Sequence, residues 1–293
     1  MVGTLRRAQG ECGLGSANSP GATAPHQSQV IAILGSRGGV GCTSIAVNLG
    51  CTLAADQANS VVLMDLDMAL GDADIALDLM PDHTLADLAL NIERLDMNFL
   101  KRSMMIHAAT GLHVLSHPIQ IADVRLVHED HLARIINLLK VSHTHLVLDL
   151  SKALIPTDLA ALRLADQILL VAQLELGSLR NVVRIMMALG IEEGLGEKVR
   201  VVMNRVGSEN QEGDISLRKA EDTIGMPVFW QLPNDSKPVM GARLQGVPLI
   251  QHAPRSKAQM ALTGLAQTLC GKADAPRESP RPSASFFGRL VGR

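Results

Sequence analysis

The sequence is poor in aromatic residues, with four Phe, one Trp and no Tyr among 293 residues. Proteins that bind single-stranded nucleic acid commonly stack bases on aromatic side chains, so this composition argues against such a platform. A net charge of -2 also argues against a broad nucleic-acid-binding surface. No nucleic-acid partner is therefore expected, and Leu, Ile, Val, Met and Ala must fill the core.

Cysteines are few, and their spacing matches no metal site. They stand far apart in the sequence, at Cys12, Cys42, Cys51 and Cys270. The sequence also lacks an apolar stretch long enough to span a bilayer, and no apolar run follows the N-terminal arginines to form a signal peptide. We therefore expect reduced thiols and a cytoplasmic protein.

Short apolar segments alternate with amphipathic segments from Val30 to about Gly271. We expect strands at 30–34, 61–65, 112–116, 145–149, 167–172, 199–203 and 227–231, and helices at 43–56, 124–140, 178–189 and 256–270. Several strands are near-continuous apolar runs, which are typical of parallel strands covered on both faces. The sequence predicts an α/β fold with a doubly wound, mostly parallel sheet of about seven strands and helices on both faces.

A glycine-rich loop joins the first expected strand to the first expected helix. Glycines there allow several backbone N–H groups to point at one anion at the positive end of a helix. The usual phosphate loop ends in Lys followed by Ser or Thr, but here Cys42 takes the Lys position and Thr43 the hydroxyl position. The candidate phosphate-binding residues are Arg37, Gly38, Gly39, Val40, Gly41, Cys42, Thr43 and Ser44.

Polar side chains follow three other expected strands. Asp65 and Asp67 end the second strand, Asp149 ends the fourth, and Asn204 with Arg205 follows the sixth. Ligands of doubly wound sheets bind at the carboxyl ends of the strands. We therefore expect these side chains to meet the glycine-rich loop in one crevice. An alternative is that the acidic residues only cap strand ends.

A dinucleotide-binding fingerprint is the competing interpretation of a glycine-rich turn between a strand and a helix. The pattern Gly-x-Gly-x-x-Gly is absent, because Gly39-x-Gly41 is followed by Cys-Thr-Ser. A nicotinamide or flavin enzyme is therefore disfavoured.

The segment from Ser36 to Ser44 resembles the deviant phosphate loop of the ParA/MinD ATPases. Asp65-Leu66-Asp67 followed by Gly71-Asp72, and the segment 77–87, are similar to the CpaE/TadZ branch, the ATPase-like proteins of Tad/Flp pilus assembly. The resemblance extends from about Val30 to Gly271. It implies a P-loop NTPase fold of the ParA/MinD kind, with ATP or ADP and Mg²⁺ as cofactors.

The resemblance also implies roles for individual residues. Arg37 stands where the family has a Lys that reaches the phosphates of a partner subunit, so it implies a nucleotide-sandwiched homodimer. Cys42 lacks the charge that stabilises phosphoryl transfer, which implies at most weak ATP hydrolysis. The implied Mg²⁺ ligands, direct or through water, are Thr43, Asp65 and Asp149; Asp67 orients water if hydrolysis occurs; Asn204, Arg205 and Pro233 contact the base.

Composition divides the chain into four parts. We expect a disordered segment at 1–28, a ParA/MinD-like nucleotide-binding domain at 29–271, a linker at 272–284 and a short basic amphipathic tail at 285–293. The apolar tail residues share one face of a helix, as in helices that attach peripherally to the inner membrane; a disordered tail or a partner-binding peptide is the alternative. These apolar residues are Phe286, Phe287, Leu290 and Val291.

Seven of the ten histidines lie between His107 and His145. They span several segments without the spacing of metal ligands, so we expect a surface cluster rather than a metal site.

Three functions remain open from the sequence. The first is an ATP-binding localisation or assembly factor for Tad/Flp pili, with weak or absent hydrolysis, that dimerises and recruits pilus secretion proteins. The second is an active ParA/MinD-type ATPase that positions a plasmid, septum or flagellum. The third is a nucleotide-free scaffold. Cys42 favours the first over the second.

Overall fold

The computed structural model describes residues 28–207 and 215–272. Eight strands form one sheet in the order β3-β4-β2-β5-β1-β6-β7-β8, and all neighbours are parallel except β3 and β4. The strands are β1 (Gln29–Gly35), β2 (Val61–Leu66), β3 (Met105–His107), β4 (Leu112–Leu115), β5 (His145–Leu150), β6 (Gln167–Ala172), β7 (Val199–Val206) and β8 (Trp230–Pro233).

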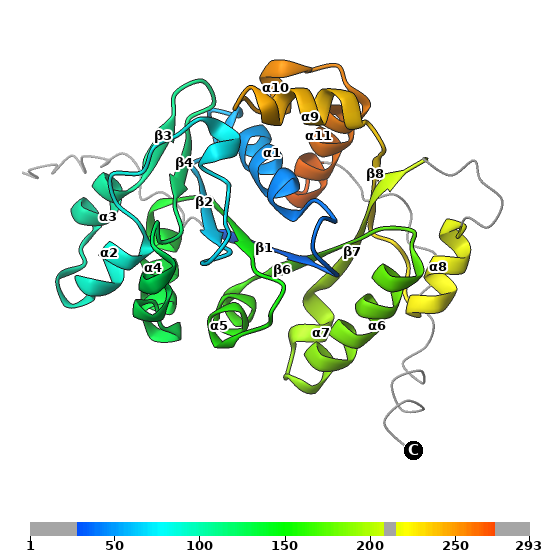
Figure 1. Ribbon diagram of the computed structural model, residues 1–293, viewed down its shortest axis with the longest axis horizontal. Helices are drawn as coiled ribbons and strands as arrows, with labels where there is room; N and C mark the ends of the chain where they lie inside the picture. Colours follow the sequence, from blue (N-terminus) through cyan, green and yellow to red (C-terminus); the bar gives the residue numbers. More distant parts are fainter. Residues whose placement is uncertain (1–27, 208–214, 273–293) are drawn as a thin grey trace, which may run out of the picture.

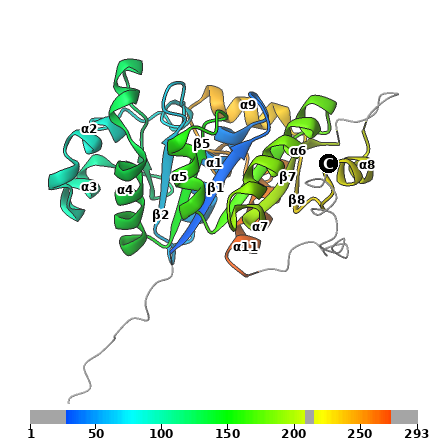
Figure 2. The same ribbon diagram turned by 90° about the horizontal axis from the view of Figure 1, so that it is seen from below.

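Helices cover both faces of the sheet (Figure 1). One face carries α1 (Cys42–Ala54), α9 (Ser236–Leu244), α10 (Leu249–His252) and α11 (Lys257–Leu269). The other face, nearer the viewer in Figure 2, carries α2 (Leu85–Leu90), α3 (Met97–Ser103), α4 (Glu129–Ser142), α5 (Pro156–Leu164), α6 (Leu176–Ile191), α7 (Leu195–Lys198) and α8 (Leu217–Ile224). Short 3₁₀ turns lie at Ile75–Leu77, Ile92–Arg94 and Ile121–Leu126.

The central strand β1 separates two hydrophobic cores. Val30, Ala32 and Leu34 belong to the core under α4–α8, whereas Ile31 and Ile33 belong to the core under α1 and α11. Successive side chains of a strand point to opposite faces, so a continuous apolar run fills both cores. The predicted doubly wound α/β fold is confirmed.

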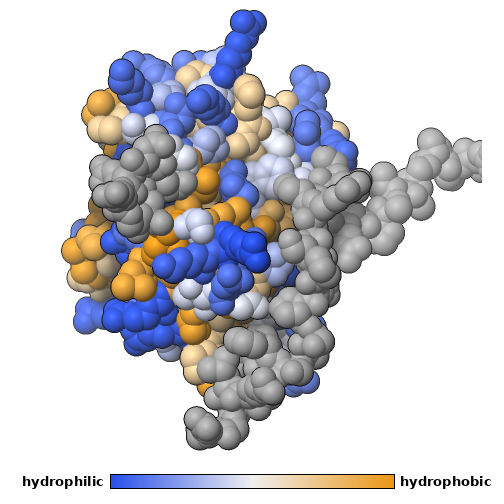
Figure 3. All heavy atoms as spheres, turned by 90° about the vertical axis from the view of Figure 1, so that its right-hand side faces the viewer, coloured by the Kyte–Doolittle hydropathy of each residue, from blue (hydrophilic) through white to orange (hydrophobic). Residues whose placement is uncertain are grey.

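The sheet differs from the prediction at both edges. The antiparallel edge strand β3 was missed because only three residues form it, without a long apolar run. At the other edge β8 begins at Trp230 rather than at 227, since Pro227 has no N–H to donate to a ladder. Figure 3 shows the face at this second edge, where apolar side chains gather between hydrophilic ones.

Helix α4 begins later than the predicted start at 124. Residues Ile121–Leu126 form a 3₁₀ turn, and the α-helix begins at Glu129. The negative charges of two acidic residues in its first turn interact favourably with the positive end of the helix dipole. Its buried residues recur at helical spacing: Leu132, Ile135, Ile136 and Leu139.

The histidines between 107 and 145 do not form the expected surface cluster. His107, His143 and His145 are buried. Burial lowers the pKa of each of them, and that of His143 falls to about 4. These imidazoles are therefore neutral and lie in the protein interior near the amino ends of the strands. The predicted surface cluster of histidines was wrong for these three residues.

Three of the regions expected from sequence lie wholly or almost wholly outside the described residues. They are the N-terminal segment, the linker and the tail with Phe286, Phe287, Leu290 and Val291. Among the helices of residues 28–207 and 215–272, none is long and apolar enough to cross a membrane.

Candidate functional site

The glycine-rich loop connects the end of β1 to the start of α1. Gly39 and Gly41 have φ angles of 79° and 102°, a region that glycine enters without a steric penalty. A Cβ on Gly41 would also lie 2.6 Å from Nδ2 of Asn204. Arg37, Gly38 and Gly39 are exposed, so the loop presents its backbone to solvent at the amino end of α1.

The start of this loop is fastened to α6. Ser36 Oγ and Ser178 Oγ are 2.8 Å apart, and Asn181 Nδ2 donates to the Ser36 carbonyl at 3.0 Å. Ser178 Oγ also accepts from the backbone N–H of Gln173 at 2.9 Å. Ser36 and Ser178 are buried, so α6 holds the loop through contacts shielded from water.

The end of β7 holds the middle of the same loop. Asn204 Nδ2 donates to the Val40 carbonyl at 2.7 Å, and Arg205 donates from its guanidinium to the Gly39 carbonyl at 3.3 Å. Arg205 has a left-handed backbone, with φ 59°. These two polar residues near the carboxyl end of β7 thus support the loop and line the cavity beside it.

Arg37 does not point over its own loop. Its guanidinium forms an ion pair with Glu175 and donates to Gln173 Oε1 at 3.4 Å. Its side chain is 42% exposed. Arg37 is therefore held at the surface, beside the amino end of α6, with room to exchange partners.

Cys42 is buried at the first turn of α1. Burial raises the pKa of its thiol to about 12, and the nearby Asp149 acts in the same direction. The side chain is therefore neutral and belongs to the apolar core on this face of the sheet. It supplies no charge to the phosphate loop.

Asp65 and Asp149 lie side by side at the carboxyl ends of β2 and β5. Both are buried, and neither carboxylate oxygen of Asp149 receives a hydrogen bond of ordinary geometry. Burial raises the pKa of Asp149 to about 8, as does the charge of Asp65, whereas the Thr43 hydroxyl and Lys152 lower it. A buried carboxyl without a well-formed hydrogen bond is unusual in folded proteins, so this position is suited to a cation.

The residues present fit Mg²⁺ bound together with phosphate. Thr43 and Asp149 supply a hydroxyl and a carboxylate, the oxygen ligands that Mg²⁺ prefers. Within residues 28–207 and 215–272, no group of three or more His, Cys, Asp or Glu side chains is placed to hold a metal alone. The remaining ligands would be phosphate oxygens and water, as is usual for Mg²⁺.

Asp65 is enclosed by the loop that follows its own strand. Its carboxylate accepts the backbone N–H groups of Asp67 at 3.2 Å and Ala73 at 3.1 Å. His117 Nδ1 lies 3.3 Å from Oδ2, and the hydrogen bond with Asp65 raises the pKa of His117 against the effect of burial. In this structure Asp65 therefore shapes the loop after β2.

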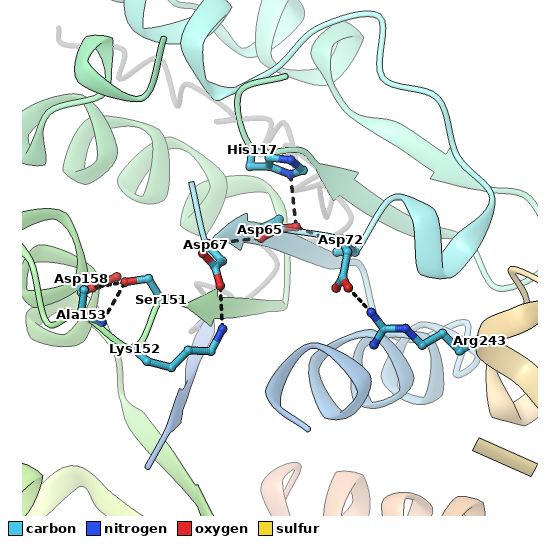
Figure 4. Close-up of polar contacts among 10 residues, drawn as sticks. Asp65, Asp67, Asp72, His117, Ser151, Lys152, Ala153, Asp158 and Arg243 are labelled. Atoms are coloured by element: carbon cyan, nitrogen blue, oxygen red, sulfur yellow. Dashed lines mark hydrogen bonds and ion pairs between the residues drawn. The ribbon is translucent and has the colours of Figure 1, made fainter. Parts of the chain in front are cut away.

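Asp67 faces a residue that sequence reasoning did not assign to the site. Lys152 Nζ lies 2.6 Å from Asp67 Oδ2 (Figure 4). Lys152 follows the end of β5, three residues beyond Asp149. The signal was visible in the sequence, because Ser151 and Lys152 directly follow a strand that ends at the crevice.

A cavity of about 600 Å³ opens beside the phosphate loop. Its walls come from the loop, α1, the ends of β6, β7 and β8, and helices α9, α10 and α11. Residues that line it include Gly41, Ser44, Asn48, Gln173, Asn204, Arg205, Pro233, Asn234, Leu249 and Leu262. Its walls combine apolar side chains with a few polar groups, as is common in small-molecule sites.

The structure brings most predicted site residues together at the carboxyl edge of the sheet. Asn204, Arg205 and Pro233 line the cavity, whereas Asp65, Asp67 and Asp149 lie on the other side of the loop, toward β2 and β5. A phosphate loop at the end of a central parallel strand, a cavity on one side and acidic residues on the other define a P-loop nucleotide-binding protein.

The chain belongs to the CobQ/CobB/MinD/ParA nucleotide-binding domain family, whose model matches residues 31–243. Antiactivator FleN of Pseudomonas aeruginosa is 29% identical over 252 residues, which cover 83% of this chain and 86% of that protein. The septum site-determining protein MinD of Synechocystis is 24% identical over 248 residues, which cover 83% of this chain and 90% of the relative.

Solved structures agree with this fold. A ParA family ATPase from Chlorobium tepidum superimposes with a TM-score of 0.77 at 20% identity, covering 82% of this chain and 98% of that one. MinD from Pyrococcus horikoshii, in complex with Mg-ADP, gives a TM-score of 0.71 at 22% identity, covering 84% and 99%. These likenesses concern the fold.

Proposed function

We propose that this protein binds ATP or ADP with Mg²⁺ and uses the bound nucleotide to assemble a homodimer. The observation that carries the proposal is the cavity on one side of the phosphate loop, together with the buried carboxyl of Asp149 on the other side, which receives no hydrogen bond of ordinary geometry. The base and ribose occupy the cavity near Asn204, Arg205 and Pro233. The phosphates lie on the residues from Arg37 to Ser44, and Thr43 and Asp149 hold Mg²⁺.

Calorimetry with ATP and ADP, each with and without Mg²⁺, tests this proposal. We expect binding by both nucleotides and tighter binding with the metal. Asp149→Asn should remove most of the metal dependence, because a neutral amide is a poorer ligand for Mg²⁺. No heat at millimolar nucleotide would reject the proposal and leave the nucleotide-free scaffold.

The position of Arg37 supports the proposed dimerisation. Its guanidinium stands at the exposed rim of the loop and has five donors suited to phosphate oxygens. Exchange of Glu175 for the phosphates of a second subunit would place the nucleotide between two protomers. Light scattering after size-exclusion chromatography should give twice the monomer mass with ATP and Mg²⁺, and the monomer mass without nucleotide.

The biological role that we propose is a localisation or assembly factor for Tad/Flp pili. The residues that support it are Asp65-Leu66-Asp67 and Gly71-Asp72, which resemble the CpaE/TadZ branch. Hydrolysis is weak or absent because Cys42 carries no charge. Deletion of the gene should abolish surface pili, seen by electron microscopy, and unchanged piliation would contradict this role.

Relatives favour a second candidate, an active ATPase of the ParA/MinD type that positions a cellular structure. An antiactivator and a septum site-determining protein are among the similar proteins. Steady-state ATP hydrolysis separates the two candidates. Robust turnover by the wild-type protein would support the positioning ATPase over the assembly factor.

We also propose that the protein is cytoplasmic and attaches peripherally to the inner membrane through residues 285–293. The apolar face of Phe286, Phe287, Leu290 and Val291, flanked by arginines, supports this proposal. Two copies in a dimer would bind more tightly than one. Co-sedimentation with anionic vesicles tests it, and equal binding by a protein that lacks 280–293 would contradict it.

A further inference from the structure

We propose that Lys152 supplies the positive charge that Cys42 lacks, by contacting the outer phosphates of the bound nucleotide from the loop after β5. The inference rests on the proposed nucleotide binding and assigns one residue within it. A lysine in the phosphate loop would reach the β- and γ-phosphates. Here a lysine from a different segment of the chain supplies a charge that holds the phosphates, while the loop position that acts during phosphoryl transfer stays uncharged.

The position of Lys152 supports the assignment. Its ammonium lies 2.6 Å from Asp67 Oδ2, and its charge acts on both the Cys42 thiol and the Asp149 carboxyl. The ammonium therefore stands at the end of β2, close enough to the Cys42 and Asp149 side chains for its charge to act on both. Figure 4 shows its side chain reaching across from the loop after β5 toward Asp67.

The loop that carries Lys152 is fixed by hydrogen bonds. Asp158, buried in the first turn of α5, accepts the hydroxyl of Ser151 at 2.6 Å and the backbone N–H of Ile155 at 3.1 Å. Ser151 Oγ in turn accepts the N–H of Ala153 at 3.2 Å. Both ends of the short loop are thus tied to α5, so the lysine is directed at the site before a ligand binds.

The other cationic side chains around the site contact different partners. Arg37 pairs with Glu175, Arg205 donates to the Gly39 carbonyl, and Arg243 pairs with Asp72. Lys152 is paired instead with Asp67 at the end of β2, and its charge lowers the pKa of the Cys42 thiol. Of these four cations, we therefore assign Lys152 to the outer phosphates.

The Lys152–Asp67 pair leaves room for a phosphate. The lysine side chain is 33% exposed, and an ammonium has three donors. Lys152 can therefore keep Asp67 as one partner while it donates to a phosphate oxygen. Hydrogen bonds in which both partners are charged are about twice as strong as neutral ones, so loss of this contact should be measurable in affinity.

Calorimetry with ATP, ADP and AMP tests the assignment on wild-type protein and on Lys152→Ala and Lys152→Arg. We expect Lys152→Ala to weaken ATP and ADP binding about tenfold to a hundredfold and to leave AMP binding unchanged. Lys152→Arg should recover much of the affinity. Lys272→Ala is a matched control, because Lys272 also lies 2.6 Å from an aspartate, Asp56, at a distant site.

A double variant distinguishes a direct contact from mere neutralisation of Asp67. If Lys152 contacts phosphate, Asp67→Asn combined with Lys152→Ala stays weak for ATP. If the double variant regains wild-type affinity, Lys152 only screens Asp67, and the inference is overturned. Equal ATP affinity of wild-type protein and Lys152→Ala overturns it too. Wild-type protein that binds no nucleotide is a separate outcome, since it rejects the proposed function itself.

Discussion

Gly71 lies directly against the carboxyl group of Asp65. A Cβ at this glycine would stand 2.4 Å from Oδ2 and 2.5 Å from Oδ1. The sequence Gly71-Asp72, which supports the family resemblance, therefore has a steric basis: only glycine lets the loop after β2 close over the buried acid at the end of its own strand.

We expect Gly71→Ala to lower the free energy of unfolding by about 1–3 kcal/mol, the usual cost of forcing an extra methyl group into a packed site. Urea unfolding measures the change. Gly177→Ala is the control, because a Cβ at Gly177 would meet no atom within 4 Å and alanine is favoured over glycine in a helix. Equal stability of Gly71→Ala and wild type would contradict the prediction.

The free energy of unfolding should fall in acid because of His143. Its folded pKa of about 4 lies below the ordinary value of 6.5, through burial, the facing His113 ring and the charge of Lys101. The unfolded chain therefore binds the proton more readily. The contribution is fully present above pH 6.5 and is lost as the pH falls toward 4.

Urea unfolding at pH 7 and pH 5 checks this prediction. His143→Gln should make the stability less dependent on pH over that interval, because glutamine does not titrate. His252→Gln, at the end of α10, is the matched control and should keep the wild-type dependence. An unchanged slope in His143→Gln would exclude His143 as the cause.

Asn204→Ala should weaken nucleotide binding although it removes no charge. The side chain supports the phosphate loop through its 2.7 Å bond to the Val40 carbonyl. Loss of one such bond typically costs about 1 kcal/mol of stability, and the loosened loop should bind ATP several-fold more weakly. Asn91→Ala removes a similar bond, to the Asp87 carbonyl at 2.9 Å, and should leave ATP affinity unchanged in calorimetry.

Arg37→Ala should abolish ATP-dependent dimerisation and leave ATP binding by the monomer largely intact. Glu175→Gln should have the opposite effect, because it releases Arg37 from its ion pair. Arg163→Ala is the control, since Arg163 forms a comparable exposed pair with Glu192 at 2.9 Å. Light scattering with ATP and Mg²⁺ reports the mass. Dimers formed by Arg37→Ala would show that Arg37 is not required.

Sequence reasoning brought the candidate site residues to one edge of the sheet because the carboxyl ends of parallel strands converge there. Apolar runs indicated the positions of β1, β2, β5 and β7, and the polar residues at or near their carboxyl ends lie at one edge of the sheet. Because these strands are parallel, Asp149 and Asn204 were expected to lie at the same edge of the sheet. No knowledge of side-chain conformation was needed for that step.

The direction in which each side chain points could not be predicted in this way. Lys152 points into the site because Asp158, six residues further along, holds its loop. Asp65 is enclosed because Gly71 permits a close approach. The sequence pattern around the buried histidines does not predict their burial, which depends on the side chains that pack against them. Each depends on contacts that the hydrophobic pattern does not specify.

The phosphate loop is held on two sides, by Ser178 and Asn181 of α6 and by Asn204 near the end of β7. A loop that is already ordered has little conformational entropy left to lose when a ligand arrives. Nucleotide capture then requires no slow rearrangement of the loop, so its rate rises in proportion to nucleotide concentration. The lifetime of the proposed nucleotide-bound state is then set by the dissociation rate of the nucleotide.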